Sequence, residues 1–105
     1  MCIRDRACGG LKRLKELDRL ISRTPIRLSL EVSSTAVAFL TACHFAVAFN
    51  SVAHVELHYL HQVFFDQLLT VTNKTNVGIY SLGHQHGLGI ELDLACVKLE
   101  YTSSI

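Results

Sequence analysis

Apolar residues at helical spacing, followed by a proline, define the first element of this chain. They recur at three- and four-residue steps with charged residues between them, as Leu11, Leu14, Leu17, Leu20 and Ile21. This is the period of an amphipathic helix. Pro25 ends the series, because proline disfavours the helical conformation of the residue before it. We therefore predict a helix over about residues 10 to 22.

The hydrophobic period changes to two after Pro25. Four apolar residues alternate with three polar ones: Ile26, Leu28, Leu30 and Val32 with Arg27, Ser29 and Glu31. Such alternation puts the apolar side chains on one face, which is typical of a half-buried strand. The sequence predicts a strand here.

Residues 36 to 49 are sorted by size rather than by polarity. The odd positions are mostly large and the even positions mostly alanine, with Leu40 and His44 as exceptions. A strand sorts side chains onto two faces, whereas a helix distributes them around its circumference. We expect one long or two short strands, and the alanines make a buried helix the competing interpretation.

Residues 50 to 69 fit both periods. Ala53, Val55, Leu57 and Tyr59 alternate as in a strand. A helical stripe with Asn50 or Ser51 as N-cap fits equally well, and comprises Val52, Val55, Tyr59, Leu60, Val63, Phe64 and Leu68. We expect a strand up to about Tyr59 followed by a helical turn, with a second helix near residues 51–69 as the alternative.

The last third of the chain predicts a hairpin. Two alternating runs flank a loop from Gly83 to Gly89, and the second run places Ile90, Leu92, Leu94 and Cys96 on one face. The predicted class is α+β, with one N-terminal amphipathic helix followed by a β-rich, mainly antiparallel body. Residues 7–105 are expected to form a single small domain.

Charge is distributed unevenly along the chain. Residues 1–27 contain eight basic residues (Lys or Arg) and three acidic ones (Asp or Glu). Residues 28–105 contain two basic and six acidic residues. The net charge of +1 creates no global field, so no nucleic-acid partner is expected. Glu16 and Asp18 favour an ordinary solvated face for the basic helix over one that binds a membrane or a nucleic acid. Exposed apolar strands make self-association an expectation.

The cysteine spacing and the hydropathy pattern favour a reducing, cytoplasmic location. Cys2, Cys8, Cys43 and Cys96 show no disulfide-scaffold spacing and no C-x-x-C pair, so we expect free thiols in a reducing environment. No signal peptide is recognised, which makes the expected location cytoplasmic if the chain is expressed. The apolar run of residues 36–49 is too short for a membrane span.

Histidines are the candidate metal ligands. His54, His58 and His61 would share one face of a helix, and His84 and His86 would share one side of a strand. Three histidines with an open position form a catalytic zinc site. The zinc-protease order H-E-x-x-H is absent, however, and on a strand His61 turns away from the other two. We therefore expect solvent-facing or hydrogen-bonded histidines and no metal, with a metal site as the less favoured alternative.

No catalytic constellation is evident. Nothing local marks Ser51, Cys43 or Cys96 as an activated nucleophile. On a strand, Cys43 and His44 would point to opposite faces. The segment GHQHGLG lacks phosphate-binding glycine spacing, so no cofactor is expected. The sequence predicts a protein that is not an enzyme and has no catalytic residues.

The first six residues, MCIRDR, match no cap, signal or motif. They correspond codon by codon to ATG TGT ATA AGA GAC AGR. This resembles the mosaic end of the transposase adapters used to prepare sequencing libraries, AGATGTGTATAAGAGACAG, translated in its one frame that contains ATG. The resemblance is to DNA and to no protein family, and it covers Met1 to Arg6 alone. It implies that these six residues were not encoded by an organism.

The composition of the remaining chain permits a related hypothesis. Read on the opposite strand, Phe codons become those of Glu or Lys, most Leu codons those of Lys, Glu or Gln, and Val codons those of polar residues. A frame opposite a soluble protein's gene would therefore be rich in Phe, Leu and Val, as this chain is. Three hypotheses follow: a spurious or antisense fragment without evolved function, a small non-enzymatic binding module, and a histidine-ligated metal protein.

Overall fold

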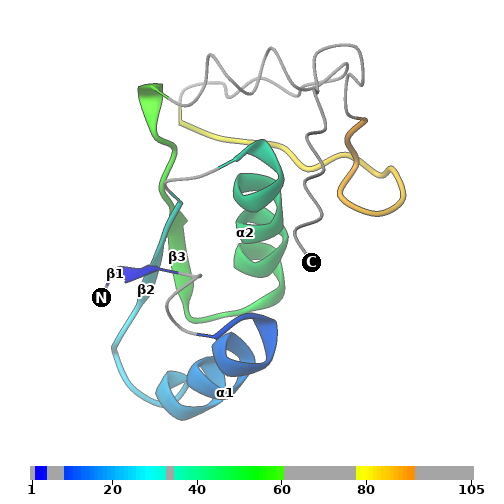
Figure 1. Ribbon diagram of the computed structural model, residues 1–105. Coiled ribbons are helices and arrows are strands. Elements are labelled where there is room, and N and C mark those ends of the chain that lie inside the picture. Colours follow the sequence, from blue (N-terminus) through cyan, green and yellow to red (C-terminus); the bar gives the residue numbers. More distant parts are fainter. Residues whose placement is uncertain (1, 5–8, 33–34, 61–77, 92–105) are drawn as a thin grey trace, which may run out of the picture.

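A small parallel sheet with two helices forms the described part of the protein. The computed structural model describes residues 2–4, 9–32, 35–60 and 78–91 (Figure 1). In chain order its elements are β1 (Cys2–Arg4), α1 (Leu11–Ile21), β2 (Leu28–Glu31), α2 (Ala36–Ala48) and β3 (Val52–Val55). The strands lie in the order β1-β2-β3, and both pairings are parallel. The mixture of helices and strands confirms the coarse class, whereas the expected antiparallel pairing is wrong.

The helix α2 explains why the pairing is parallel. Two parallel neighbours need a crossover connection, which an α-helix usually supplies, and α2 is that connection between β2 and β3. The predicted strands over residues 36 to 49 are therefore wrong, and the competing buried helix is correct. The Thr35 hydroxyl caps the helix by accepting a hydrogen bond from the Ala38 amide at 3.3 Å. Alanine, abundant here, is the strongest helix former.

The helix α1 confirms the prediction made from leucine spacing. Leu14 and Ile21 are buried, while Leu11 and Leu20 remain exposed. At the C-terminal end, the Thr24 amide donates to the Ile21 carbonyl at 2.8 Å, and the Thr24 hydroxyl donates to the same oxygen at 2.7 Å. These bonds satisfy a carbonyl that the helix itself leaves unpaired.

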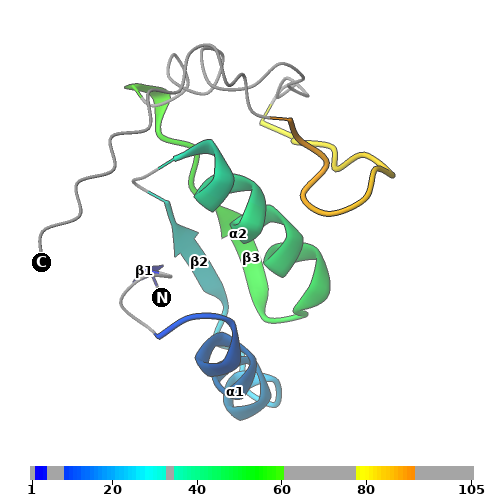
Figure 2. The same ribbon diagram turned by 45° about the vertical axis from the view of Figure 1, so that its right-hand side comes forward.

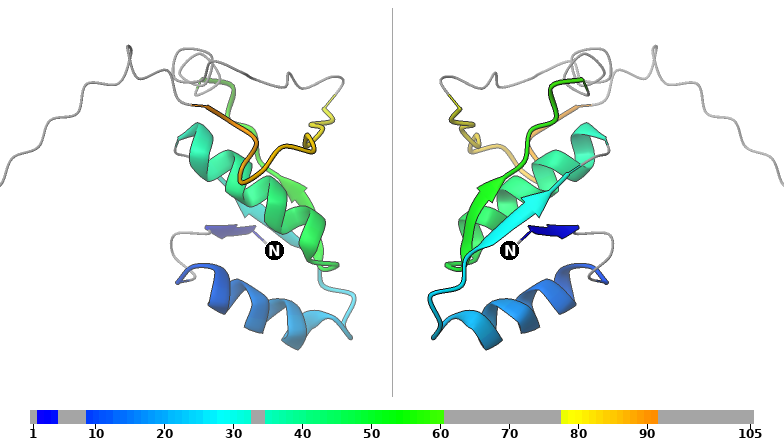
Figure 3. Two further views of the ribbon diagram at one scale, coloured as in Figure 1. Left: turned by 90° about the vertical axis from the view of Figure 1, so that its right-hand side faces the viewer. Right: turned by 90° about the vertical axis from the view of Figure 1, so that its left-hand side faces the viewer.

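The core lies where β2 meets the two helices. Leu28 and Leu30 of β2 are fully buried, as their alternation predicted, and Val32 just after the strand is buried as well. Ile26 lies before β2 and is exposed. The helix α2 runs along the sheet, and α1 lies at the end where β2 and β3 begin (Figures 2 and 3). The buried apolar residues are Leu14, Ile21, Leu28, Leu30, Val32, Ala36, Phe39, Leu40, Ala42 and Cys43.

The strand β3 is shorter than predicted. It pairs Leu28 with Val52 and Leu30 with Val55, with a register shift between these pairs. The strand was expected to extend to Tyr59 and ends at Val55. Because residues 52–55 form a strand, the alternative of a helix over residues 51–69 is wrong for this part of the chain. The backbone is helical at Tyr59 and Leu60, which agrees with the expected helical turn. Residues 61–69 lie outside the described residues.

The predicted hairpin falls largely beyond what the structure describes. Residues 80–91 contain neither helix nor strand. Within the predicted Gly83 to Gly89 loop, the Gly89 amide donates to the His86 carbonyl at 3.3 Å, and Gly87 and Gly89 have positive φ angles. The second predicted run, including Leu92, Leu94 and Cys96, lies outside the described residues apart from Ile90 and Glu91.

Candidate functional site

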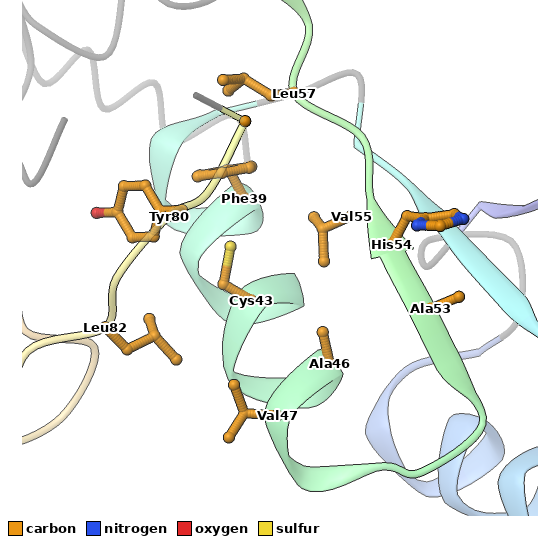
Figure 4. A pocket seen from close by; sticks show the side chains of 11 residues that line it. Phe39, Cys43, Ala46, Val47, Ala53, His54, Val55, Leu57, Tyr80 and Leu82 are labelled. Atoms are coloured by element: carbon orange, nitrogen blue, oxygen red, sulfur yellow. The ribbon is translucent and has the colours of Figure 1, made fainter. Parts of the chain in front are cut away.

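An apolar cavity lies between α2, β3 and residues 78–82 (Figure 4). Its volume is about 330 Å³, and it is partly open to solvent. Eleven residues line it: Phe39, Cys43, Ala46, Val47, Ala53, His54, Val55, Leu57, Gly78, Tyr80 and Leu82. Most of these side chains are aliphatic or aromatic, so the cavity is suited to an apolar molecule or side chain.

One face of α2 forms a wall of the cavity. Phe39, Cys43, Ala46 and Val47 follow at steps of four, three and one residues, which places them on the same side of a helix. This spacing is present in the sequence, where the size alternation of residues 36 to 49 obscured it. The signal would have been recognisable once the segment was treated as a helix.

An aromatic contact holds the segment after Gly78 against α2. The rings of Phe39 and Tyr80 are 5.3 Å apart between centroids and nearly perpendicular, at 86°. Edge-to-face pairs of this kind contribute about 0.5–1.5 kcal/mol beyond the area they bury. Leu82, two residues further on, also packs against the core. Tyr80 and Leu82 therefore form the wall opposite β3.

The thiol of Cys43 is a lining group without nucleophilic character. It is buried, and desolvation raises the pKa of the Cys43 thiol from 9.0 to about 11. At neutral pH the thiol is therefore protonated, and the thiolate is the nucleophilic form. His44 does not line the cavity. Residues 36–48 form a helix and not the expected strand. The side chains of Cys43 and His44 therefore point about 100° apart around the helix axis, and do not point to opposite faces of a sheet.

The candidate metal ligands are dispersed over the described residues. His54 lies in β3, is exposed, and points away from α2 (Figure 4). His58 is half-buried beyond the strand, and His84 and His86 are exposed in the glycine-containing loop. His61 lies outside the described residues. Within the described ranges, no three His, Cys, Asp or Glu residues form a group that could hold a metal ion.

A polar contact fixes the end of the sheet next to α1. The Asp18 carboxylate accepts a hydrogen bond from the Ser51 amide at 3.0 Å, and the Ser51 carbonyl accepts one from the Leu28 amide at 2.8 Å. The sequence predicts Asp18 on a solvated face and does not indicate this role. No local signal marks it, because its partner is 33 residues away in the chain.

Two further results concern membrane-spanning helices and similarity to known proteins. Among the helices in the described part of the chain, none is long and apolar enough to cross a membrane. Comparisons with protein-family models, with curated proteins and with solved structures found no match.

Proposed function

We propose that Met1 to Arg6 derive from a sequencing adapter and that the chain is a translated fragment without an evolved biochemical activity. The observation that carries this proposal is the agreement of Met1 to Asp5 with five consecutive codons of the adapter, whose last two bases, AG, are the first two of an Arg6 codon. The body of the chain supports it through a composition that fits the strand opposite a soluble protein's gene. No catalytic step is assigned to any residue.

The protein surface also supports this proposal. Five large apolar side chains are 66–81% exposed: Leu20, Val47, Tyr59, Leu60 and Ile79. Selection for solubility keeps exposed side chains of this kind few. A chain translated from an unselected frame has no such constraint, so we expect it to self-associate.

The decisive experiment is on nucleotides. The parent sequencing read or contig is recovered, the bases encoding Met1 to Arg6 are inspected, and the opposite strand is translated across residues 7–105. Adapter bases ending at Arg6, with a longer open frame on the opposite strand, are the expected result. Genomic sequence with a ribosome-binding site before Met1 and no opposing frame would overturn the proposal.

A second candidate function is a small, non-enzymatic binding module, and the cavity beside α2 favours it. Its volume of about 330 Å³ lies near the lower end of the range for small-molecule sites, about 300–1,000 Å³. Most of its lining residues are apolar, and the polar side chains among them belong to Cys43, His54 and Tyr80. The ligand class that fits is a small, uncharged aromatic molecule.

This candidate is tested by titrating the full chain with toluene and indole while recording amide chemical shifts. Saturable shifts are expected for residues lining the cavity. Ala46→Phe fills the cavity and should abolish them, whereas Ala48→Phe adds the same ring at an exposed position of α2 and should leave them unchanged. If Ala46→Phe is folded and still binds with the same affinity, the cavity is not the binding site.

A further inference from the structure

The outer face of α1 carries a row of four cationic side chains, which we call the basic stripe: Lys12, Lys15, Arg19 and Arg23. They follow at steps of three, four and four residues, and an α-helix turns about 100° per residue. Lys12, Lys15 and Arg19 therefore share one face of α1, and Arg23 continues the row just past its end. All four are exposed.

The buried side of α1 fixes the direction of the basic stripe. Leu14 and Ile21 are 1% and 8% exposed and belong to the core. On the helix they lie roughly opposite Lys12 and Arg19. Core packing therefore holds the basic stripe toward solvent along the length of the helix.

The two acidic residues of α1 have partners other than the side chains of the basic stripe. The Glu16 carboxylate lies 3.0 Å from the Arg13 guanidinium. Asp18 is half-buried and accepts the hydrogen bond from the Ser51 amide. In the part of the chain that the structure describes, no side chain of the basic stripe has an ion pair or a hydrogen bond. The sequence predicts a balanced, solvated face from these two acids, whereas the fold turns Asp18 toward Ser51, and Glu16 pairs with Arg13 on the same helix.

We infer that the basic stripe binds the phosphate backbone of a nucleic acid without sequence preference. Lys12 to Arg19 extends over about 10 Å of helix at about 1.5 Å per residue, with Arg23 just beyond the helix end. Duplex DNA presents a phosphate about every 1.7 Å of its axis. Cationic side chains on one helix face therefore meet several phosphates at once. The near-neutral net charge of the chain limits long-range attraction, so binding is local, weak and sensitive to salt.

A membrane surface fits this helix less well than a nucleic acid does. An interfacial helix binds by burying its apolar face among the lipids. The apolar face of α1 is occupied, because Leu14 and Ile21 pack into the core. The two exposed leucines, Leu11 and Leu20, lie on opposite flanks of the basic stripe and cannot enter a bilayer together. The inference concerns the folded chain and does not depend on the origin of Met1 to Arg6.

The test measures fluorescence anisotropy of a short, labelled, mixed-sequence DNA duplex titrated with the full chain over a series of salt concentrations. Four phosphate contacts predict that log K falls against log salt with a slope of about −3 to −4. The variant Lys12→Gln/Lys15→Gln/Arg19→Gln/Arg23→Gln should weaken binding at least about tenfold at low salt and bring the slope close to zero. Circular dichroism and the urea midpoint verify its fold.

The matched control is Arg13→Gln/Glu16→Gln, which removes an ion pair from the same helix without changing the net charge or the basic stripe. Its affinity for the duplex should equal that of the parent chain. Glu16→Gln alone leaves the Arg13 guanidinium without its partner, which adds one uncompensated positive charge beside the basic stripe and should tighten binding severalfold. Equal affinities for the parent and the quadruple variant would overturn the inference, as would binding to phosphatidylserine vesicles with no binding to the duplex.

Discussion

The Asp18 carboxylate of α1 accepts a hydrogen bond from the amide of Ser51, the residue immediately before β3. The two atoms are 3.0 Å apart, and Ser51 is only 3% exposed. The carbonyl of Ser51 accepts from Leu28 of β2, so one residue bonds to both α1 and β2. This contact fixes α1 against the end of the sheet, in addition to the apolar packing of Leu14 and Ile21.

Removing this contact should destabilise the fold. Asp18→Ala leaves the Ser51 amide without its acceptor in a nearly dry position, which costs about 1–3 kcal/mol. Asp18→Asn keeps an acceptor oxygen and should cost less. Urea unfolding, followed by circular dichroism, measures both differences.

The control for Asp18 is the other acid of the same helix. Glu16 pairs with Arg13 at the surface, where the two side chains are 45% and 70% exposed, so Glu16→Ala should change the free energy of unfolding by about 0–1 kcal/mol. Equal losses for Asp18→Ala and Glu16→Ala would show that the contact with Ser51 contributes no stability.

The central strand should be the most sensitive part of the core. Leu30 is fully buried in β2, and Leu30→Ala should cost about 2–5 kcal/mol or abolish the unfolding transition. Leu20 is 75% exposed, and Leu20→Ala should remain within about 0.5 kcal/mol of the parent chain. Thermal and urea unfolding check both values. Similar losses at the two positions would contradict the burial of β2.

Stability should fall at alkaline pH because of Cys43. Burial raises the pKa of its thiol from 9.0 to about 11, so the unfolded chain releases this proton first as the pH rises. The contribution of the thiol is therefore fully present below pH 9 and is lost as the pH approaches 11. The loss is on the order of 2 kcal/mol.

Urea unfolding between pH 8 and pH 11 measures this loss, with Cys43→Ala as the comparison. The variant lacks the titrating thiol of Cys43 and is otherwise identical to the parent chain. Its stability should therefore decline less steeply than that of the parent chain. Parallel declines would contradict the raised pKa of Cys43.

Deleting Met1 to Arg6 should leave a cooperative fold. These residues contain β1, a three-residue strand at the edge of the described sheet, where its neighbour is β2. The β2–β3 pair, α2 and the buried leucines remain, so the urea midpoint should decrease by less than it does in Leu30→Ala. Complete loss of the transition would show that the adapter-like residues are essential to the fold, which is unexpected for residues added by chance.

Sequence periodicity predicted the correct type of element where one face of the element is buried and a local signal marks where the element ends. The leucines of α1 and the alternation at Leu28 and Leu30 belong to this class, and Pro25 separates them. Periodicity failed at residues 36–48, where α2 has apolar residues on all sides. Without a polar face, helical and strand periods cannot be distinguished by pattern. The cavity beside α2 was missed for the same reason, since it depends on the helical spacing of Phe39, Cys43 and Ala46.

The sequence by itself determined α1 and the buried side of β2, because each follows from the spacing of neighbouring residues. The tertiary structure decided that residues 36–48 form a helix, since this segment connects two parallel strands and packs along the sheet. It also decided the role of Asp18, whose partner Ser51 is close only after β2 and β3 have paired. Contacts between distant parts of the chain determine these features, and local periodicity contains no information about such contacts.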